Sequence, residues 1–234
     1  MKKLSLKTAL LAAAMLALPI SANAVPLVAS VDGKLVNDTV AHLTWAADMN
    51  LMGTQAAGYT GGSTAFFTQI IADWGSSTTF GSYTHTLAAS DFTDRGAMTW
   101  FGALAWVNYL NKPSYEGYSD WRLPTGGELS YLFVTDLGNK ANQSVLNSAG
   151  DTAEQMANLA LFSNVESIYW SGTDGGRNTA FYFYDGSLGN YGVSNTFYAV
   201  AVRDVSPIPE PETYALMLAG LGVVGFMARR RKAK

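Results

Sequence analysis

The sequence of 234 residues offers few side chains for nucleophilic or acid–base chemistry, since it has two histidines, His42 and His85, and no cysteine. Without cysteine the chain has no disulfide, thiolate metal site or cysteine nucleophile. No serine lies in a G-x-S-x-G turn, although a Ser-His-Asp arrangement that assembles only in space stays open. We expect His85 in a polar, exposed segment. Carboxylates such as Asp91 and Asp94 are too common to predict an acid–base pair, so we expect a protein that is not an enzyme.

Among possible cofactors, calcium is the one that oxygen-bearing side chains in the loops after residue 171 could bind. Asp174 and Asp185, with Asn178 and Asn190 nearby, could supply ligands. No D-x-[DN]-x-[DN]-G loop is present, however, and ordinary turns have the same composition. We therefore expect no metal and no other cofactor, with calcium at these loops as the less favoured alternative.

Residues 185–197, DGSLGNYGVSNTF, form the best candidate for ligand recognition. Gly, Ser, Asn and Tyr are typical of adaptable binding surfaces. Tyr191 could stack on a sugar ring, while Asp185, Asn190 and Asn195 could form hydrogen bonds with its hydroxyl groups. The alternative of a plain surface loop stays open.

Residues 120–129, DWRLPTGGEL, have a pattern typical of architecture. Thr125 and Glu128 have the spacing of a capping box, which predicts a helix that runs to about residue 137 and ends at Gly138. Trp121 is expected to be buried, and Arg122 to pair with a nearby carboxylate. With a later Tyr-Trp-Ser segment, the motif residues are Trp121, Arg122, Leu123, Pro124, Thr125, Glu128, Leu129, Tyr169, Trp170 and Ser171.

The apolar residues follow helical spacing in some segments and strand spacing in others, so both helices and strands must position these residues. Apolar side chains at helical spacing predict helices over residues 65–74 and 97–110, the second ending near Asn111 before Pro113. Strands are expected at residues 43–45, 167–171, 179–184 and 198–202, and the last three should form one antiparallel sheet. Residues 53–63 and 75–91 are expected to be irregular. The fold class is therefore α+β.

Both ends of the chain carry targeting patterns. Lys2, Lys3 and Lys7 precede a short apolar run at residues 10–20, and Ala22 and Ala24 occupy the positions that signal peptidase reads, so residues 1–24 are predicted to be a cleaved signal peptide. A buried N-terminal helix is the alternative. Near the other end, residues 214–228 form an apolar helix, too short to span a bilayer comfortably, and a basic cluster follows it.

The C-terminal pattern resembles the PEP-CTERM sorting signal of Gram-negative bacteria, over residues 207–234. The resemblance implies processing by an exosortase-type membrane enzyme, a precursor tethered to the inner membrane, and export to the cell surface or beyond. A plain tail anchor is the alternative. The residues that carry the resemblance are Pro209, Glu210, Pro211, Arg229, Arg230 and Arg231.

The segment between these two signals, residues 25–206, resembles the Lcl C-terminal domain over about residues 39–204. The W-R-L-P-T-x-x-E-L signature is matched at every fixed position by residues 121–129, and Tyr169, Trp170 and Ser171 match a second motif. The resemblance implies a fold similar to C-type lectins, with two helices packed on a small twisted antiparallel sheet and long loops. It also implies an exported binding or adhesion module.

The net charge of the segment between the two signals limits the classes of ligand that we expect it to bind. Between the two signals the chain has seven Lys and Arg against sixteen Asp and Glu, a net charge of about −9. Such a body repels nucleic acid and other polyanions, so sulfated-glycan binding is not expected. We predict an exported surface or matrix protein that recognises glycan or exopolysaccharide. A purely structural matrix component and a hydrolase with an unrecognised site are the alternatives.

Overall fold

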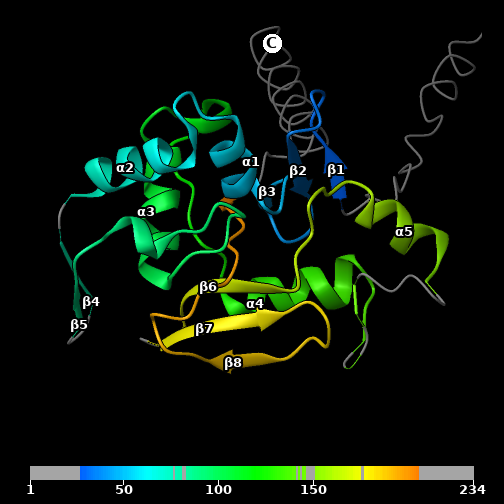
Figure 1. The fold of residues 1–234 in the computed structure, drawn as a ribbon. Helices are drawn as coiled ribbons and strands as arrows, with labels where there is room; N and C mark the ends of the chain where they lie inside the picture. The colour runs from blue at the N-terminus through cyan, green and yellow to red at the C-terminus, as the bar shows by residue number, and fades with distance from the viewer. Residues whose placement is uncertain are drawn as a thin grey trace, which may run out of the picture.

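The computed structural model describes residues 27–205, except residues 76, 81–82, 141, 143, 146–150 and 175–176 (Figure 1). The predicted signal peptide at residues 1–24 and the sorting tail at residues 207–234 lie outside the described residues. Among the helices within the described part, none is both long and apolar enough to cross a membrane. The predicted apolar helix at residues 214–228 falls outside that part.

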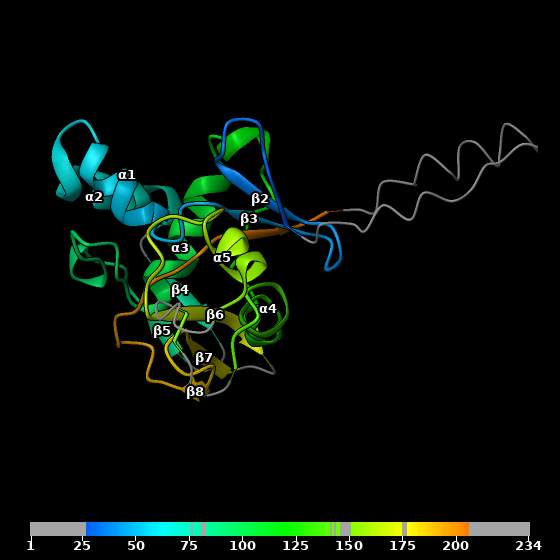
Figure 2. The same ribbon diagram turned by 90° about the vertical axis from the view of Figure 1, so that its right-hand side faces the viewer.

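Antiparallel strands form two sheets and a separate ribbon in the described part of the chain. The four-stranded sheet has the order β1-β2-β3-β9 and contains β1 (Leu27–Ala29), β2 (Leu35–Asp38), β3 (Leu43–Ala46) and β9 (Val202–Asp204). The three-stranded sheet has the order β6-β7-β8 and contains β6 (Ile168–Asp174), β7 (Arg177–Tyr182) and β8 (Leu188–Asn190). The ribbon pairs β4 (Thr78–Phe80) with β5 (Tyr83–His85). Figure 2 shows β9 running beside β3, which brings the end of the described chain back to its beginning.

The helices surround these sheets unevenly (Figure 1). Three of them gather at one side: α1 (Leu51–Gly58), α2 (Gly62–Trp74) and α3 (Trp100–Asn111). Along the three-stranded sheet lie α4 (Gly126–Tyr131) and its continuation, the π-turn η3 (Leu132–Asp136), while α5 (Ala153–Leu159) lies at the opposite side from α2. Two short 3-10 turns, η1 (Ala89–Asp91) and η2 (Tyr115–Gly117), complete the described elements. The fold is therefore mixed α+β, with more helices than the two that the family resemblance implied.

Alternation along the strands divides the interior into two hydrophobic clusters. In β6, Tyr169 belongs to the cluster around α4 and Trp170 to the cluster around α3. In β7, Phe181 faces the α4 cluster and Ala180 the α3 cluster. Because successive side chains of a strand point to opposite faces, one strand can contribute to both clusters. The strands thus separate the two hydrophobic clusters of the core.

The helices expected at residues 65–74 and 97–110 are present as α2 and α3, and α3 ends at Asn111 as predicted. Thr125 and Glu128 form the predicted capping box at α4, and the chain turns at Gly138, where φ is +65°. Leu129, at 0% exposure, faces the core as expected.

Two expectations about irregular segments were wrong. Residues 53–63 were expected to be a loop, but α1 covers Leu51–Gly58, because Asn50 caps that helix by accepting a hydrogen bond from the Gly53 amide. Its Ala and Gly residues show almost no apolar periodicity, so tertiary packing decides the helix. Residues 75–91 contain the β4–β5 ribbon and η1 instead of an irregular stretch.

The prediction of the third strand in this sheet was also wrong. Residues 198–202 do not pair antiparallel with β7; β8, inside the predicted 185–197 loop, takes that place. The chain instead crosses between the sheets, with one bridge from Tyr198 to Tyr169, and then joins β3 as β9. Ala199 and Ala201 enter the α3 cluster, while Val200 and Val202 enter the α4 cluster. Both faces of this segment are buried, so it is apolar throughout, and only the size of its side chains alternates.

Candidate functional site

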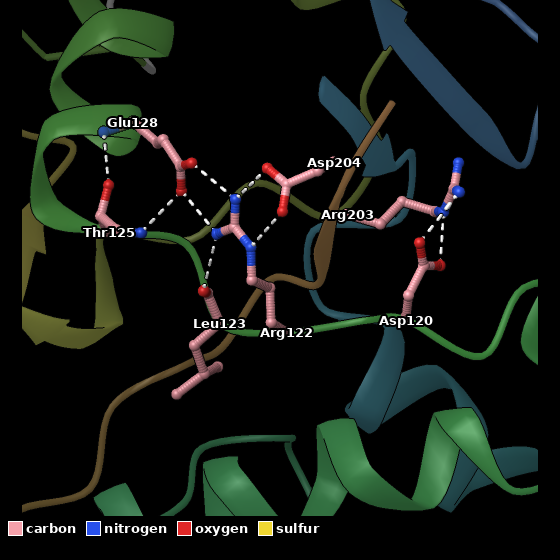
Figure 3. Close-up of polar contacts among 7 residues, drawn as sticks. All are labelled: Asp120, Arg122, Leu123, Thr125, Glu128, Arg203 and Asp204. Carbon is pink, nitrogen blue, oxygen red and sulfur yellow. Dashed lines mark hydrogen bonds and ion pairs between the residues drawn. The ribbon is translucent and has the colours of Figure 1, made fainter. Parts of the chain in front are cut away.

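Arg122 lies at the centre of the signature motif and joins three parts of the chain (Figure 3). Its guanidinium donates two hydrogen bonds to Glu128, of 2.7 and 2.8 Å, and two to Asp204 in β9, of 2.7 and 3.2 Å. The Arg122 backbone exchanges two hydrogen bonds with Val202, of 2.8 and 2.9 Å. The bidentate geometry uses the guanidinium on both sides, so this arginine holds elements together.

Glu128 binds Arg122 and also forms part of the helix cap. Its carboxylate accepts a hydrogen bond of 2.8 Å from the Thr125 amide, while its own amide donates to Thr125 Oγ1 at 3.1 Å. Burial by itself would raise the pKa of Glu128, but the hydrogen bonds from Arg122 and Thr125 outweigh burial and leave the pKa lowered. Hydrogen bonds from Arg122 likewise lower the pKa of Asp204.

The guanidinium of a second arginine in the same region is also paired with a carboxylate. Arg203 donates hydrogen bonds of 2.7 and 3.0 Å to Asp120, and its guanidinium lies 3.8 Å from the centre of the Tyr118 ring (Figure 3). The hydrogen bonds from Arg203 lower the pKa of Asp120. Neither arginine of this cluster presents its full set of donors to a ligand.

The Tyr-Trp-Ser motif ties β6 to the start of α3. Trp170 donates a hydrogen bond of 2.8 Å from its indole nitrogen to the Met98 carbonyl. In return, Trp100 donates one of 3.0 Å to the Ser171 carbonyl. Tyr169, Trp170 and Ser171 all have 0% exposure. Trp121 and Leu123 are buried as well, at 3% and 4% exposure. The signature residues therefore contribute packing and internal hydrogen bonds.

The residues predicted to recognise a ligand do not act as one free loop. Asp185 Oδ1 accepts hydrogen bonds from the amide and hydroxyl of Ser187, at 2.9 and 2.7 Å, and Asn195 donates one of 3.2 Å to the Gly192 carbonyl. These two side chains stabilise their own turns. Asn190 is exposed at the end of β8.

Tyr191, the predicted stacking residue, is half-buried. Its ring contacts those of Phe197 and Tyr182, with centroids 5.1 and 5.6 Å apart. The ring also covers Gly189 in β8, where a Cβ atom would lie 2.6 Å from a Tyr191 ring carbon. Glycine at this position therefore allows Tyr191 to lie flat against the sheet.

Together with two neighbours, Tyr191 forms what we call the tyrosine patch, made of Tyr182, Tyr184 and Tyr191. The Tyr182 ring lies 5.0 Å from the Tyr184 ring, and Tyr184 is 47% exposed. Burial and a hydrogen bond with Tyr191 raise the pKa of Tyr182. The sequence reasoning missed Tyr182 and Tyr184 as candidates. The alternation of Phe and Tyr in residues 180–184 could have indicated them, because it separates a purely apolar face from one with hydroxyl groups.

An open polar depression of about 490 Å³ lies beside α1. Its wall includes Glu166, whose carboxylate accepts a hydrogen bond of 3.1 Å from Asn50. Burial raises the pKa of Glu166, while hydrogen bonds from Asn50 and Tyr198 oppose the rise in part. The lining residues are Asn50, Gly53, Thr54, Ala57, Asp94, Arg95, Asn164, Glu166 and Tyr198.

His85 lies in an exposed polar segment as expected, between the exposed residues Thr84 and Thr86, but its side chain is held by specific contacts. Its ring stacks on Phe101 with centroids 4.7 Å apart, and its Nε2 lies 2.9 Å from an oxygen of Asp91. Asp91 is buried and also accepts a hydrogen bond of 2.8 Å from Thr99, the residue that caps α3. The contact fastens the β4–β5 ribbon to α3.

Within the described residues, no group of three or more His, Asp and Glu side chains is placed to hold a metal ion. The side chains of Asp174 and Asn178 are outside the description, and Asp185 is engaged by Ser187. Calcium at these loops therefore stays an untested alternative.

Comparison with known families gives two matches. The model of the Lcl C-terminal domain matches residues 34–205, and that of the PEP-CTERM protein-sorting motif matches residues 207–232. No curated protein matches the sequence. The first match covers the described fold from β2 to β9, and the second covers the Pro-Glu-Pro motif and the arginine cluster.

Proposed function

This chain belongs to the Lcl C-terminal domain family, and from that premise we propose that it acts outside the cell as a binding protein for glycan or exopolysaccharide. Its PEP-CTERM motif indicates export and sorting to the cell surface by an exosortase system. The proposal includes a lectin-like arrangement of helices and sheet, and a role that is not enzymatic.

The observation that carries this proposal is the tyrosine patch. The Tyr182 ring contacts the rings of Tyr184 and Tyr191, so the three side chains together offer apolar ring surface and hydroxyl groups. Such side chains give large, rigid contact area and also hydrogen-bond, which suits a sugar with its apolar ring faces and hydroxyl rim. The acidic body favours a neutral glycan over an anionic one.

A glycan array that includes neutral and anionic polysaccharides tests the proposal. We expect selective binding to neutral glycans, weakened roughly tenfold by Tyr184→Ala or Tyr191→Ala, which corresponds to about 1.4 kcal/mol. Gly189→Ala should weaken binding similarly, because the new methyl group displaces the Tyr191 ring.

Leu188→Ala is the matched control. Leu188 is 48% exposed in the same edge strand and pairs with Phe181, so its side chain lies on the other face from Tyr182. Its loss should leave affinity unchanged. Binding that none of the patch substitutions alters would contradict the assignment to the patch, and a chain that binds no glycan at all would favour the purely structural matrix role.

A hydrolase is the second candidate function, and the polar depression is the observation that favours it. A carboxyl group with raised pKa in a depression that also holds Asp94 and Arg95 is a candidate general acid. The test is turnover of the bound polysaccharide, measured as new reducing ends. Turnover that is lost in Glu166→Gln and kept in Asp73→Asn would establish this function in place of simple binding.

The proposed processing gives three segments: a signal peptide at residues 1–24, the mature domain at residues 25–206, and a sorting signal at residues 207–234. We propose that the apolar stretch at residues 214–228 tethers the precursor to the inner membrane of a Gram-negative cell until the exosortase-type enzyme acts. Mass spectrometry of the exported protein should find Val25 as the first residue and no arginine cluster. An exported protein with both ends intact would contradict this processing.

A further inference from the structure

Two buried carboxyl groups meet at the junction of β2 and η3. Asp38 ends β2 and Asp136 ends η3, each is only 2% exposed, and the two carboxyl groups contact each other. Asp38 Oδ1 accepts hydrogen bonds from the amides of Val40 and Ala41, at 2.9 and 2.7 Å. Apart from this mutual contact, Asp38 Oδ2 and both carboxylate oxygens of Asp136 are buried without a hydrogen-bond partner.

A third buried side chain follows Asp136 by three residues in the sequence. Asn139 is 5% exposed, and its Oδ1 also has no hydrogen-bond partner. Of the five buried side-chain polar atoms without a partner in the described residues, four are oxygens of Asp38, Asp136 and Asn139, and the fifth is the indole nitrogen of Trp45. Buried polar atoms are nearly always paired in folded proteins, so a concentration of this kind indicates a missing partner.

Among the described residues, no side-chain cation supplies that partner. None of the ion pairs formed by the described Lys, Arg and His side chains involves Asp38 or Asp136. Burial and the contact with Asp38 disfavour the charged form of Asp136 and raise its pKa. Two carboxyl groups that face each other away from water need either a shared proton or a bound cation.

We propose that Asp38 and Asp136 bind a calcium ion, with the Asn139 amide oxygen as a further ligand. All the available ligands are oxygens, the donor type that calcium prefers, and calcium accepts carboxylates, amide oxygens, backbone carbonyls and water in irregular geometry. Two carboxylates neutralise a divalent cation. The site is separate from the Asp174 and Asp185 loops, where the sequence suggested calcium.

The surroundings give the site a rigid frame. Gly138, with φ of +65°, turns the chain between Asp136 and Asn139, and the Asn139 amide donates a hydrogen bond of 2.9 Å to the Phe133 carbonyl. Asn158 in α5 donates one of 2.7 Å to the Asp136 carbonyl. A calcium ion here would connect the four-stranded sheet with η3 and α5, and so would stabilise the exported fold.

Thermal unfolding of the full-length protein in detergent, with EDTA, Mg²⁺ or Ca²⁺, tests the site. Calcium at about 100 times its dissociation constant should raise the melting temperature by roughly 5 to 10 °C over EDTA. Asp136→Asn should abolish the rise and, in EDTA, should melt no lower than the wild type, because it removes the repulsion between the carboxylates. Asp185→Asn is the matched control and should keep the rise.

Terbium binding gives a readout that does not depend on unfolding. Burial, and after it the nearby charges of Asp136 and Asp38, raise the pKa of Tyr131, so this ring lies near both carboxyl groups and should sensitise terbium luminescence at the site. Calcium should compete with this emission, and Asp136→Asn should remove it. The proposal is overturned if calcium and EDTA give the same melting temperature in the wild type, in which case the two carboxyl groups share a proton. It is equally overturned if Asp136→Asn keeps both effects.

Discussion

At the scale of single residues, Arg122 forms more polar contacts than any other residue of the signature motif. It bonds to Glu128 at the start of α4 and to Asp204 at the end of the described chain, residues that are 76 positions apart in sequence. Salt bridges between exposed groups contribute little, but this guanidinium is half-buried and bidentate on both sides. Its loss leaves the Glu128 carboxylate partly desolvated and short of donors.

Arg122→Met should therefore lower the free energy of unfolding by about 1.5 to 3 kcal/mol, the range for hydrogen bonds to charged groups. Lys112→Met is the control, since the Lys112–Asp73 pair is exposed and should contribute less than about 1 kcal/mol. Urea denaturation of both variants measures the difference. Equal effects in the two variants would show that Arg122 has no special structural role.

The same cluster predicts how stability depends on pH. The folded-state pKa values of Glu128 and Asp204 are lowered, so the unfolded chain binds protons first as the pH falls. Their stabilising contribution is fully present above about pH 4, the unfolded pKa, and is lost as the pH falls through the folded pKa values. The difference in unfolding free energy between the wild type and Arg122→Met isolates this contribution, and it should shrink as the pH falls from about 6 to about 2. A difference that stays constant over this range would contradict this account.

At the scale of elements, the capping box decides where α4 begins. The Thr125 hydroxyl and the Glu128 carboxylate each satisfy one backbone amide of the first turn. Thr125→Ala should lower the free energy of unfolding by about 1 kcal/mol, whereas Thr125→Ser keeps the hydroxyl and should stay within a few tenths of the wild type. Chemical denaturation compares the two variants. A loss as large in Thr125→Ser as in Thr125→Ala would mean that the methyl group, and not the cap, matters.

At the scale of the whole molecule, β9 closes the fold by pairing with β3, immediately before the sorting motif at residues 207–232. A chain that ends at residue 205 should therefore fold cooperatively, since it keeps every described strand. A chain that ends at residue 199 loses β9 together with Val200 and Val202, each at 0% exposure. Each buried valine contributes roughly 1.5 to 3 kcal/mol, so the shorter chain should show no cooperative thermal transition. A cooperative transition in the shorter chain would contradict this role of β9.

The sequence by itself determined the features that depend on local patterns. The helical spacing of Phe66, Phe67 and Ile70 in α2, the Thr125–Glu128 cap and the turn at Gly138 follow from periodicity and backbone preference within a few residues. The family resemblance was likewise readable, because residues 121–129 match their signature directly, and the family model covers residues 34–205.

Only the tertiary structure decided which strands become neighbours and which side chains meet. Alternation in residues 198–202 predicted a strand but not its partner, because a segment buried on both faces gives the same pattern in several places. Asp38 and Asp136 lie almost a hundred residues apart and no spacing connects them, yet folding brings their carboxyl groups into contact. Strand pairing and buried charge clusters depend on contacts between distant segments, and their energies cannot be read from one local window of sequence.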